Sequence, residues 1–108
     1  MKNKLSYQQG DVLLKPIATL PAKAKKVKPG KRGHVLAEGE ITGHHHRIEE
    51  IDDAELYREG ERMLLAVEKE TQLKHEEHGT ITVPPGVYEV GIVREWDYLK
   101  EMERKVVD

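Results

Sequence analysis

Five of the six histidines in this chain lie in two short stretches, and their spacing is suited to binding a metal ion. The first stretch, residues 43–50, contains three consecutive histidines and ends in two glutamates. Alternate residues of a β-strand point to the same side. We therefore expect His44, His46 and Glu50 to share one face, with His45 on the other. Imidazole and carboxylate groups are ligands for divalent transition metals, so this stretch predicts a metal site on one face of a strand.

The second stretch contains His75 and His78, separated by two glutamates. On a straight strand these histidines would face opposite ways, but a turn or bulge at Glu76, Glu77 and Gly79 would let both converge. The sequence leaves open which of the two joins the first stretch. We expect imidazoles from both stretches to meet in one pocket around a divalent ion. Histidine and carboxylate ligands do not distinguish zinc, manganese and iron, and the absence of cysteine excludes thiolate ligands.

Proton transfer at such a site would fall to Glu76, Glu77 or a histidine that does not bind the metal, since these groups can be tuned to titrate near neutral pH. In a hydrolytic reaction the metal would lower the pKa of a bound water, and one of the two glutamates would carry the proton. If the metal is iron, oxygen chemistry becomes the better expectation. The sequence thus predicts a metal-dependent enzyme, with hydrolysis as the reaction to test first.

A basic loop over residues 21–33 is the candidate substrate-binding region. It includes Lys26, Lys28, Lys31 and Arg32, and together with Arg47 these cations would attract a phosphate-bearing or nucleic-acid substrate. Arg47 would reach the histidines only if its strand bends. The loop lacks interleaved aromatic residues, so base stacking is not expected. The alternative is a solvated surface, because the +7 balance of residues 1–47 and the −9 balance of residues 48–108 interleave in one compact domain.

Two other interpretations of the histidines compete with a catalytic metal. Three consecutive histidines after a glycine are also typical of an exposed loop that binds metal adventitiously. The protein would then be a binding module without catalysis, which contacts a small molecule or a nucleic acid. In the other interpretation the metal is structural and stabilises a small core.

Length and composition predict one small β domain over residues 1–108. The chain has no phenylalanine and one tryptophan, so its core must consist of valine, isoleucine and leucine, which suits strands. Many short apolar segments with Gly and Pro turns between them are typical of a barrel or sandwich. No segment resembles a signal peptide or a membrane-spanning helix, and we expect a cytoplasmic protein that does not bind membranes.

The expected strands are antiparallel, and they cover residues 12–17, 34–41, 55–58, 62–68, 71–74, 80–83 and 87–93. Residues 1–9 are polar and are expected to be unstructured before a turn at Gly10 and Asp11. The tail changes period: Leu99, Met102 and Val106 recur at helical spacing, and this predicts a short helix within residues 97–107.

The histidine motif resembles that of the cupin superfamily. His44, His46 and Glu50 have the H-x-H-x3-E spacing, and a Pro-Gly turn follows at residues 84–86. The resemblance covers residues 39–88 and implies a cupin-like barrel that pairs into a homodimer through sheet edges. The histidine of the second cupin motif would follow the Pro-Gly turn. Here a histidine from the second stretch would have to take its place. Over most of its length the chain also resembles a group of small bacterial and phage proteins with no assigned activity.

Overall fold

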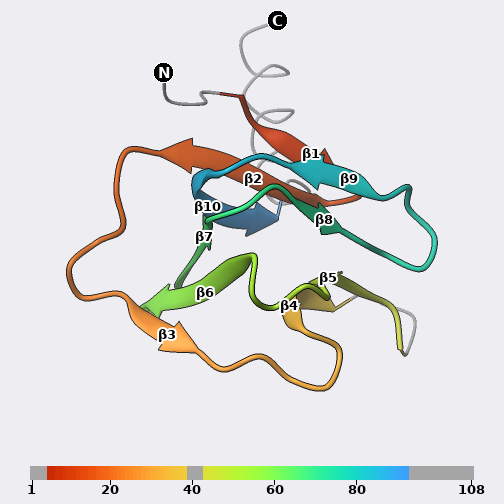
Figure 1. Ribbon diagram of the computed structural model, residues 1–108, viewed down its shortest axis with the longest axis horizontal. Coiled ribbons are helices and arrows are strands. Elements are labelled where there is room, and N and C mark those ends of the chain that lie inside the picture. The colour runs from red at the N-terminus through yellow and green to blue at the C-terminus, as the bar shows by residue number, and fades with distance from the viewer. Residues whose placement is uncertain (1–4, 39–42, 93–108) are drawn as a thin grey trace, which may run out of the picture.

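The computed structural model describes residues 5–38 and 43–92, and within them the chain is all-β with antiparallel pairing throughout (Figure 1). Its strands are β1 (Tyr7–Gln9), β2 (Val12–Ile17), β3 (Lys25–Val27), β4 (His34–Glu38), β5 (His45–Ile48), β6 (Ala54–Glu59), β7 (Arg62–Val67), β8 (Thr71–Leu73), β9 (Ile81–Val83) and β10 (Gly86–Ile92). No helix occurs in this part of the chain, and hence none that is long and apolar enough to cross a membrane.

Six of the strands form one sheet in the order β1-β2-β10-β7-β6-β3. The other four form two separate hairpins, β4–β5 and β8–β9. The large sheet ends at β1 on one side and at β3 on the other, so the described strands do not close into a barrel. The predicted antiparallel β fold is therefore confirmed, but of the barrel or sandwich that we expected, the closed barrel is not formed by the described strands. The predicted helix within residues 97–107 lies outside the described residues.

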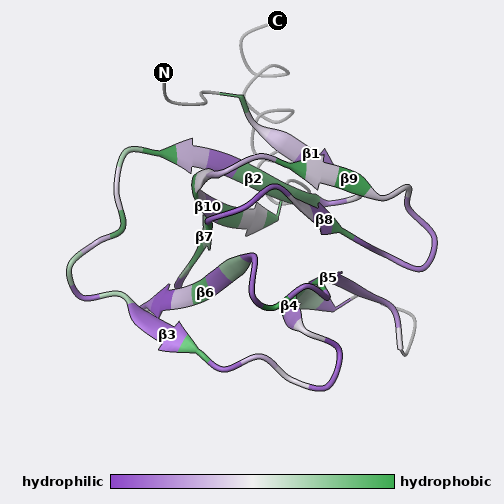
Figure 2. Cartoon of the chain, in the orientation of Figure 1, coloured by the Kyte–Doolittle hydropathy of each residue, from purple (hydrophilic) through white to green (hydrophobic). Residues whose placement is uncertain are grey.

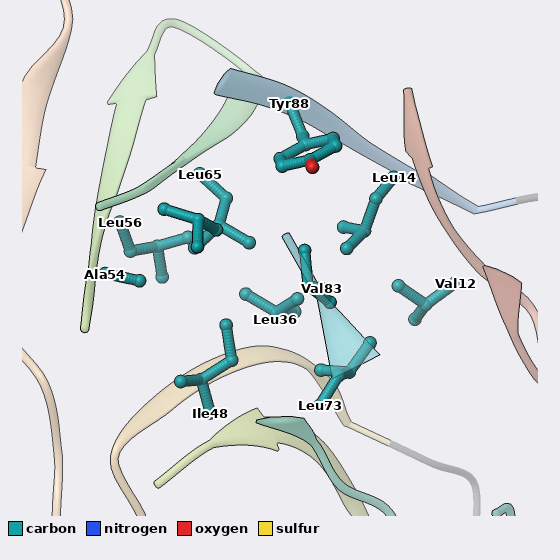
Figure 3. Close-up of a cluster of buried hydrophobic side chains, with 11 residues drawn as sticks. Val12, Leu14, Leu36, Ile48, Ala54, Leu56, Leu65, Leu73, Val83 and Tyr88 are labelled. Atoms are coloured by element: carbon teal, nitrogen blue, oxygen red, sulfur yellow. The ribbon is translucent and has the colours of Figure 1, made fainter. Parts of the chain in front are cut away.

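The core lies between one face of the large sheet and the two hairpins. The sheet contributes Val12, Leu14, Ala54, Leu56, Leu65, Val67 and Tyr88, while the hairpins contribute Leu36, Ile48, Leu73 and Val83. Figure 3 shows Ile48 and Leu73 directed towards the sheet side chains. Full burial of each such side chain stabilises the fold by roughly 1.5–3 kcal/mol relative to exposure. This shared core holds both hairpins, and with them both histidine stretches, against the same sheet.

Most of the predicted strands are present, although their ends differ. β2 matches its predicted range, and β6 and β7 form the predicted hairpin, in which Gly60 has a φ of 60°. The clearest error concerns the N-terminal region, which we expected to be unstructured. Residues Tyr7–Gln9 form β1 and pair with β2, because Gly10 adopts a φ of 58° and lets the chain reverse there.

The basic loop predicted over residues 21–33 contains an edge strand. β3 pairs with β6, and Lys26 on β3 forms an ion pair with Glu55 on β6 at 3.1 Å. Charged side chains on an edge strand discourage pairing with another chain. In Figure 2 this strand is largely hydrophilic, as is the long connection that follows β8, whereas apolar stretches lie within β2 and β7. The connection after β8 contains the second histidine stretch.

Candidate metal centre

The two histidine stretches meet because β5 and the end of β8 lie side by side. Arg47 and Lys74 exchange both of their backbone hydrogen bonds, with N–O distances of 2.9 and 2.8 Å. The next residues on either side are His46 and His75, whose ring centroids are 4.3 Å apart. The predicted meeting of the two stretches is thus present in the structure.

Three imidazoles form the first group of candidate ligands. His78 lies nearly parallel to His46 at 5.7 Å between ring centroids, and 4.7 Å from His75. Ligand nitrogens of His46, His75 and His78 all lie within 4.8 Å of one another. Two nitrogens bound to the same zinc ion at about 2.1 Å can be no more than about 4.2 Å apart. Small side-chain movements would therefore allow all three to bind one ion.

His46 is held in one orientation by Gln9. The Gln9 amide nitrogen donates to the backbone oxygens of Leu73 (2.8 Å) and Gly79 (2.9 Å), which fixes the amide with its oxygen towards His46. This oxygen lies 2.9 Å from His46 Nδ1. An amide oxygen only accepts hydrogen bonds, so Nδ1 must carry the proton and Nε2 keeps its lone pair. A hydrogen bond of this kind orients metal-binding histidines in proteins.

Burial of its ring and the neighbouring histidines both favour the neutral form of His46. Burial of the ring, followed by repulsion from His75, lowers the pKa of His46 to about 4 from its ordinary value of 6.5, even though Asp11 opposes the shift. Burial and then the neighbouring His78 also lower the pKa of His75. Neutral imidazoles bind metals, whereas protonated ones do not, so the lowered pKa values of His46 and His75 favour the charge state that a cation requires.

The second histidine stretch is folded into the turn that its spacing required. His75 Nδ1 accepts the backbone N–H groups of Glu77 (3.0 Å) and His78 (3.4 Å). This turn brings the rings of His75 and His78 to the same side. It also places the proton of a neutral His75 on Nε2. His75 can therefore bind an ion through Nε2 only after that proton moves or leaves.

A second group consists of His44, His75 and Glu76, whose ligand atoms also lie within 4.8 Å of one another. His44 contacts the His75 ring edge-on at 5.7 Å, and its Nδ1 lies 3.8 Å from the Glu77 carboxylate. His44 and His46 therefore both contact His75, although His44 lies just before β5 begins. His45 points elsewhere, with Nε2 3.5 Å from Glu38.

The Glu76 carboxylate is already occupied by hydrogen-bond donors. One oxygen accepts the backbone N–H of His45 at 2.9 Å, and the other accepts Arg47 at 2.9 Å and also Arg32. The His45 N–H is the largest of the causes that lower the pKa of Glu76 to about 2. A carboxylate with this pKa stays ionised near neutral pH. The proton transfer that we expected of Glu76 is therefore poorly matched to its surroundings. The Glu77 carboxylate lies instead 3.8 Å from His44 Nδ1.

Glu50 is not brought to either histidine group among the described residues. β5 ends at Ile48, so the strand alternation on which this prediction depended does not extend to Glu50. The Glu50 side chain is exposed, and its backbone oxygen accepts the N–H of Asp53 in the following turn.

The predicted substrate-binding cations divide into two sets. Arg47 does reach the histidine region, where its guanidinium binds Glu76 and Glu49, and Arg32 joins it on Glu76. Lys26 pairs with Glu55 on the edge strand instead. Lys28 and Lys31 are exposed. The charge of both arginines is thus balanced by carboxylates, which leaves less of it to attract a phosphate.

Three consecutive residues at the β1–β2 turn belong to the site and were missed by sequence reasoning. Gln9 orients His46, and the Asp11 carboxylate lies 3.4 Å from His46 Nε2. Between them, Gly10 lies against His78: a Cβ at this position would be 2.5 Å from His78 Nε2. The Gly-Asp turn was visible in the sequence, but no local spacing relates it to histidines so far along the chain.

Comparisons with known proteins identify a family but no activity. No curated protein and no solved structure matches the chain, so the resemblance to cupins is not confirmed. A family model described as a domain of unknown function, DUF8820, matches residues 8–93. This range includes both histidine stretches and the β1–β2 turn, and it covers most of the sequence. The chain therefore belongs to the DUF8820 family.

Proposed function

We propose that this protein is a metal-dependent enzyme that binds one divalent transition-metal ion through His46, His75 and His78. The observation that supports this most strongly is the convergence of three ligand nitrogens within 4.8 Å, from two stretches distant in sequence. The orientation of His46 by Gln9 adds to it, because the hydrogen bond at Nδ1 leaves the Nε2 lone pair free to bind an ion. Zinc, manganese and iron are all compatible with imidazole ligands.

The first histidine group is a better metal site than the second because the His46 nitrogen is more available than the Glu76 carboxylate. In the second group the Glu76 carboxylate accepts hydrogen bonds from a backbone N–H and two arginines. A metal there would have to displace at least one of these donors. In the first group, the hydrogen bond of His46 to Gln9 uses Nδ1, so a metal could bind Nε2 without breaking it.

The reaction we propose is hydrolysis. A metal site keeps a position for water when the ion takes more ligands than the protein supplies, and zinc in such a site lowers the pKa of that water to about 7. Glu77 is the proposed proton acceptor, since it is exposed and lies beside His44 at 3.8 Å. A phosphate-bearing substrate would be attracted by the exposed Lys28 and Lys31, with Arg32 at the edge of the site.

A structural metal is the second candidate, and one observation favours it. The residues around His46 come from the β1–β2 turn, from β5 and from the connection after β8. An ion bound there would connect three separate segments of a small domain, and binding to the folded state alone stabilises it.

Metal content and turnover together separate these candidates. Protein purified without a histidine tag should retain about one divalent ion per chain, and it should hydrolyse a generic phosphomonoester such as p-nitrophenyl phosphate. His78→Ala should remove both properties while circular dichroism still shows a folded β domain. His45→Gln is the matched control, because this neighbour of His46 belongs to neither group. Full metal content without turnover on phosphoesters would contradict the hydrolytic proposal, and unfolding on metal removal would favour the structural one.

A further inference from the structure

We propose that Asp11 supplies a carboxylate ligand to the ion held by the histidines, in place of the Glu50 that the sequence suggested. This inference depends on the proposed metal site. It rests on a contact between a carboxylate and the imidazole nitrogen that we propose to bind the metal: Asp11 Oδ1 lies 3.4 Å from His46 Nε2. Asp11 is not within 4.8 Å of all three histidine ligand atoms, so its side chain would have to turn towards the ion.

When His46 is neutral, the contact joins two hydrogen-bond acceptors. The only proton of a neutral His46 is on Nδ1, because the Gln9 amide oxygen faces that nitrogen at 2.9 Å and its amide nitrogen is used by two backbone oxygens. Nε2 and the Asp11 carboxylate therefore present lone pairs to each other. A cation between them turns this repulsion into two bonds.

The β1–β2 turn holds Asp11 on the same side as His78. Gly10 has a φ of 58°, and its Cα lies so close to the His78 ring that a Cβ would be 2.5 Å from Nε2. The turn thus packs directly on one proposed ligand, while the next residue faces another. The Asp11 side chain is 42% exposed, whereas that of His46 is 3% exposed. Asp11 therefore lies on the solvent side of the buried imidazole, where an entering ion would meet it.

Charge also favours a carboxylate in this position. Three neutral imidazoles contribute no negative charge to balance a divalent ion, whereas a single carboxylate reduces the net charge of the site by one. The Glu76 carboxylate already neutralises Arg32 and Arg47. A donor set of imidazoles and one carboxylate suits zinc, iron(II), manganese or cobalt, and it disfavours copper(I), which prefers sulfur ligands.

Cobalt(II) titration of the tag-free, metal-stripped full chain tests this assignment. We expect visible absorption bands from a bound cobalt ion in the wild type. Asp11→Asn should weaken cobalt affinity roughly tenfold or more, because losing a direct ligand should cost at least as much as losing a hydrogen-bond partner of a ligand. It should also shift the positions of the absorption bands. Asp11→Glu should recover part of the affinity. Glu50→Gln is the matched control and should leave affinity and spectrum unchanged. Thermal unfolding of each metal-free variant establishes that the fold is retained.

The outcomes separate this inference from the proposed function. If the wild type binds no cobalt, the metal site itself is refuted and this inference with it. If the wild type binds cobalt and Asp11→Asn binds it equally well, only the Asp11 assignment is wrong. Tighter binding by Asp11→Asn would also overturn it. That result would mean that Asp11 forms an ion pair with a protonated His46, because loss of the pair makes the imidazole easier to deprotonate and so more available to the metal.

Discussion

The two histidine groups share His75 but differ in how their polar atoms are used. Around His46, Nδ1 is hydrogen-bonded to the Gln9 amide oxygen, and Nε2 faces the Asp11 carboxylate at 3.4 Å. Around Glu76, a backbone N–H and two guanidinium groups bind the carboxylate oxygens. Proximity of ligand atoms is therefore similar in the two groups, and availability is what distinguishes them. This difference supports our proposal that the first group binds the metal, whereas the second forms ion pairs.

Removing His46 should produce the largest effect. His46→Ala takes away the best-oriented ligand, so cobalt affinity should fall on the order of a hundredfold or more, beyond the range seen for outer-sphere partners. It also leaves the Gln9 amide oxygen buried without a donor, which costs about 1–3 kcal/mol of stability. Cobalt titration and urea unfolding of the metal-free protein measure the two losses. An unchanged affinity would mean that the first group is not the metal site.

Replacing Gln9 should give the next largest effect without touching a ligand. Gln9→Met keeps an unbranched side chain but removes the hydrogen bond that fixes the proton on His46 Nδ1. We expect metal affinity to fall about 10–100-fold. In the metal-free wild type, long-range ¹H–¹⁵N NMR of the His46 ring should show the Nδ1–H form, and in Gln9→Met it should show a mixture of forms. A wild-type ring protonated on Nε2 would contradict the proposed role of Gln9.

Glu76→Gln should separate the two groups most clearly. If Glu76 binds the arginines and not the metal, this variant should retain cobalt affinity within about threefold. That change is smaller than the roughly 10–100-fold loss that follows removal of a hydrogen-bond partner of a ligand. The variant should instead change the free energy of unfolding and the way in which that free energy depends on pH. The pKa of Glu76 is lowered from 4.5 to about 2, so its ionised form stabilises the fold above pH 4.5, and this stabilisation is lost as the pH falls towards 2.

Urea unfolding of metal-free protein between pH 6 and pH 2 measures this contribution. The wild type should lose stability over the lower part of that range more steeply than Glu76→Gln does. Parallel profiles would show that the carboxylate contributes nothing. A large loss of cobalt affinity in the variant would instead move the metal to the second group.

The smallest effect is expected at the far edge of the sheet. Lys26→Ala removes an exposed ion pair with Glu55, and pairs of this kind contribute little to stability. Metal affinity should not change. If turnover on a phosphoester is detected, Lys26→Ala should alter it much less than a double Lys28→Ala, Lys31→Ala variant. Equal losses of turnover would show that the whole basic segment binds substrate.

Much of the fold could be predicted because its strands follow local patterns. The Arg62–Val67 strand is a run of apolar residues after a Glu-Gly-Glu turn, and β2 matched its predicted range. β1 was missed because its Tyr-Gln-Gln sequence is polar. It forms a strand through pairing with β2, and its buried Gln9 serves the histidines rather than the core. Pairing of this kind depends on tertiary contacts, so the strand propensities of the residues alone do not predict it.

The candidate site could be predicted only in part, for the same reason. The histidines were identifiable from residue type, and the turn that brings His75 and His78 together was expected from Gly79 and the glutamates. Glu50 was chosen by extending strand alternation past the end of β5. Asp11 and Gln9 could not be found in this way, because only the folded β1–β2 turn places them beside His46. The availability of Glu76 likewise depends on Arg32, which is distant in sequence.

X-ray absorption at the zinc edge, on tag-free protein loaded with one equivalent of zinc and then desalted, tests the central claim most directly. We predict scattering from imidazole rings with zinc–nitrogen distances of about 2.0–2.1 Å, and loss of part of this scattering in His78→Ala but not in His45→Gln. Zinc that is removed by desalting, or that is surrounded by oxygen alone, would contradict the account.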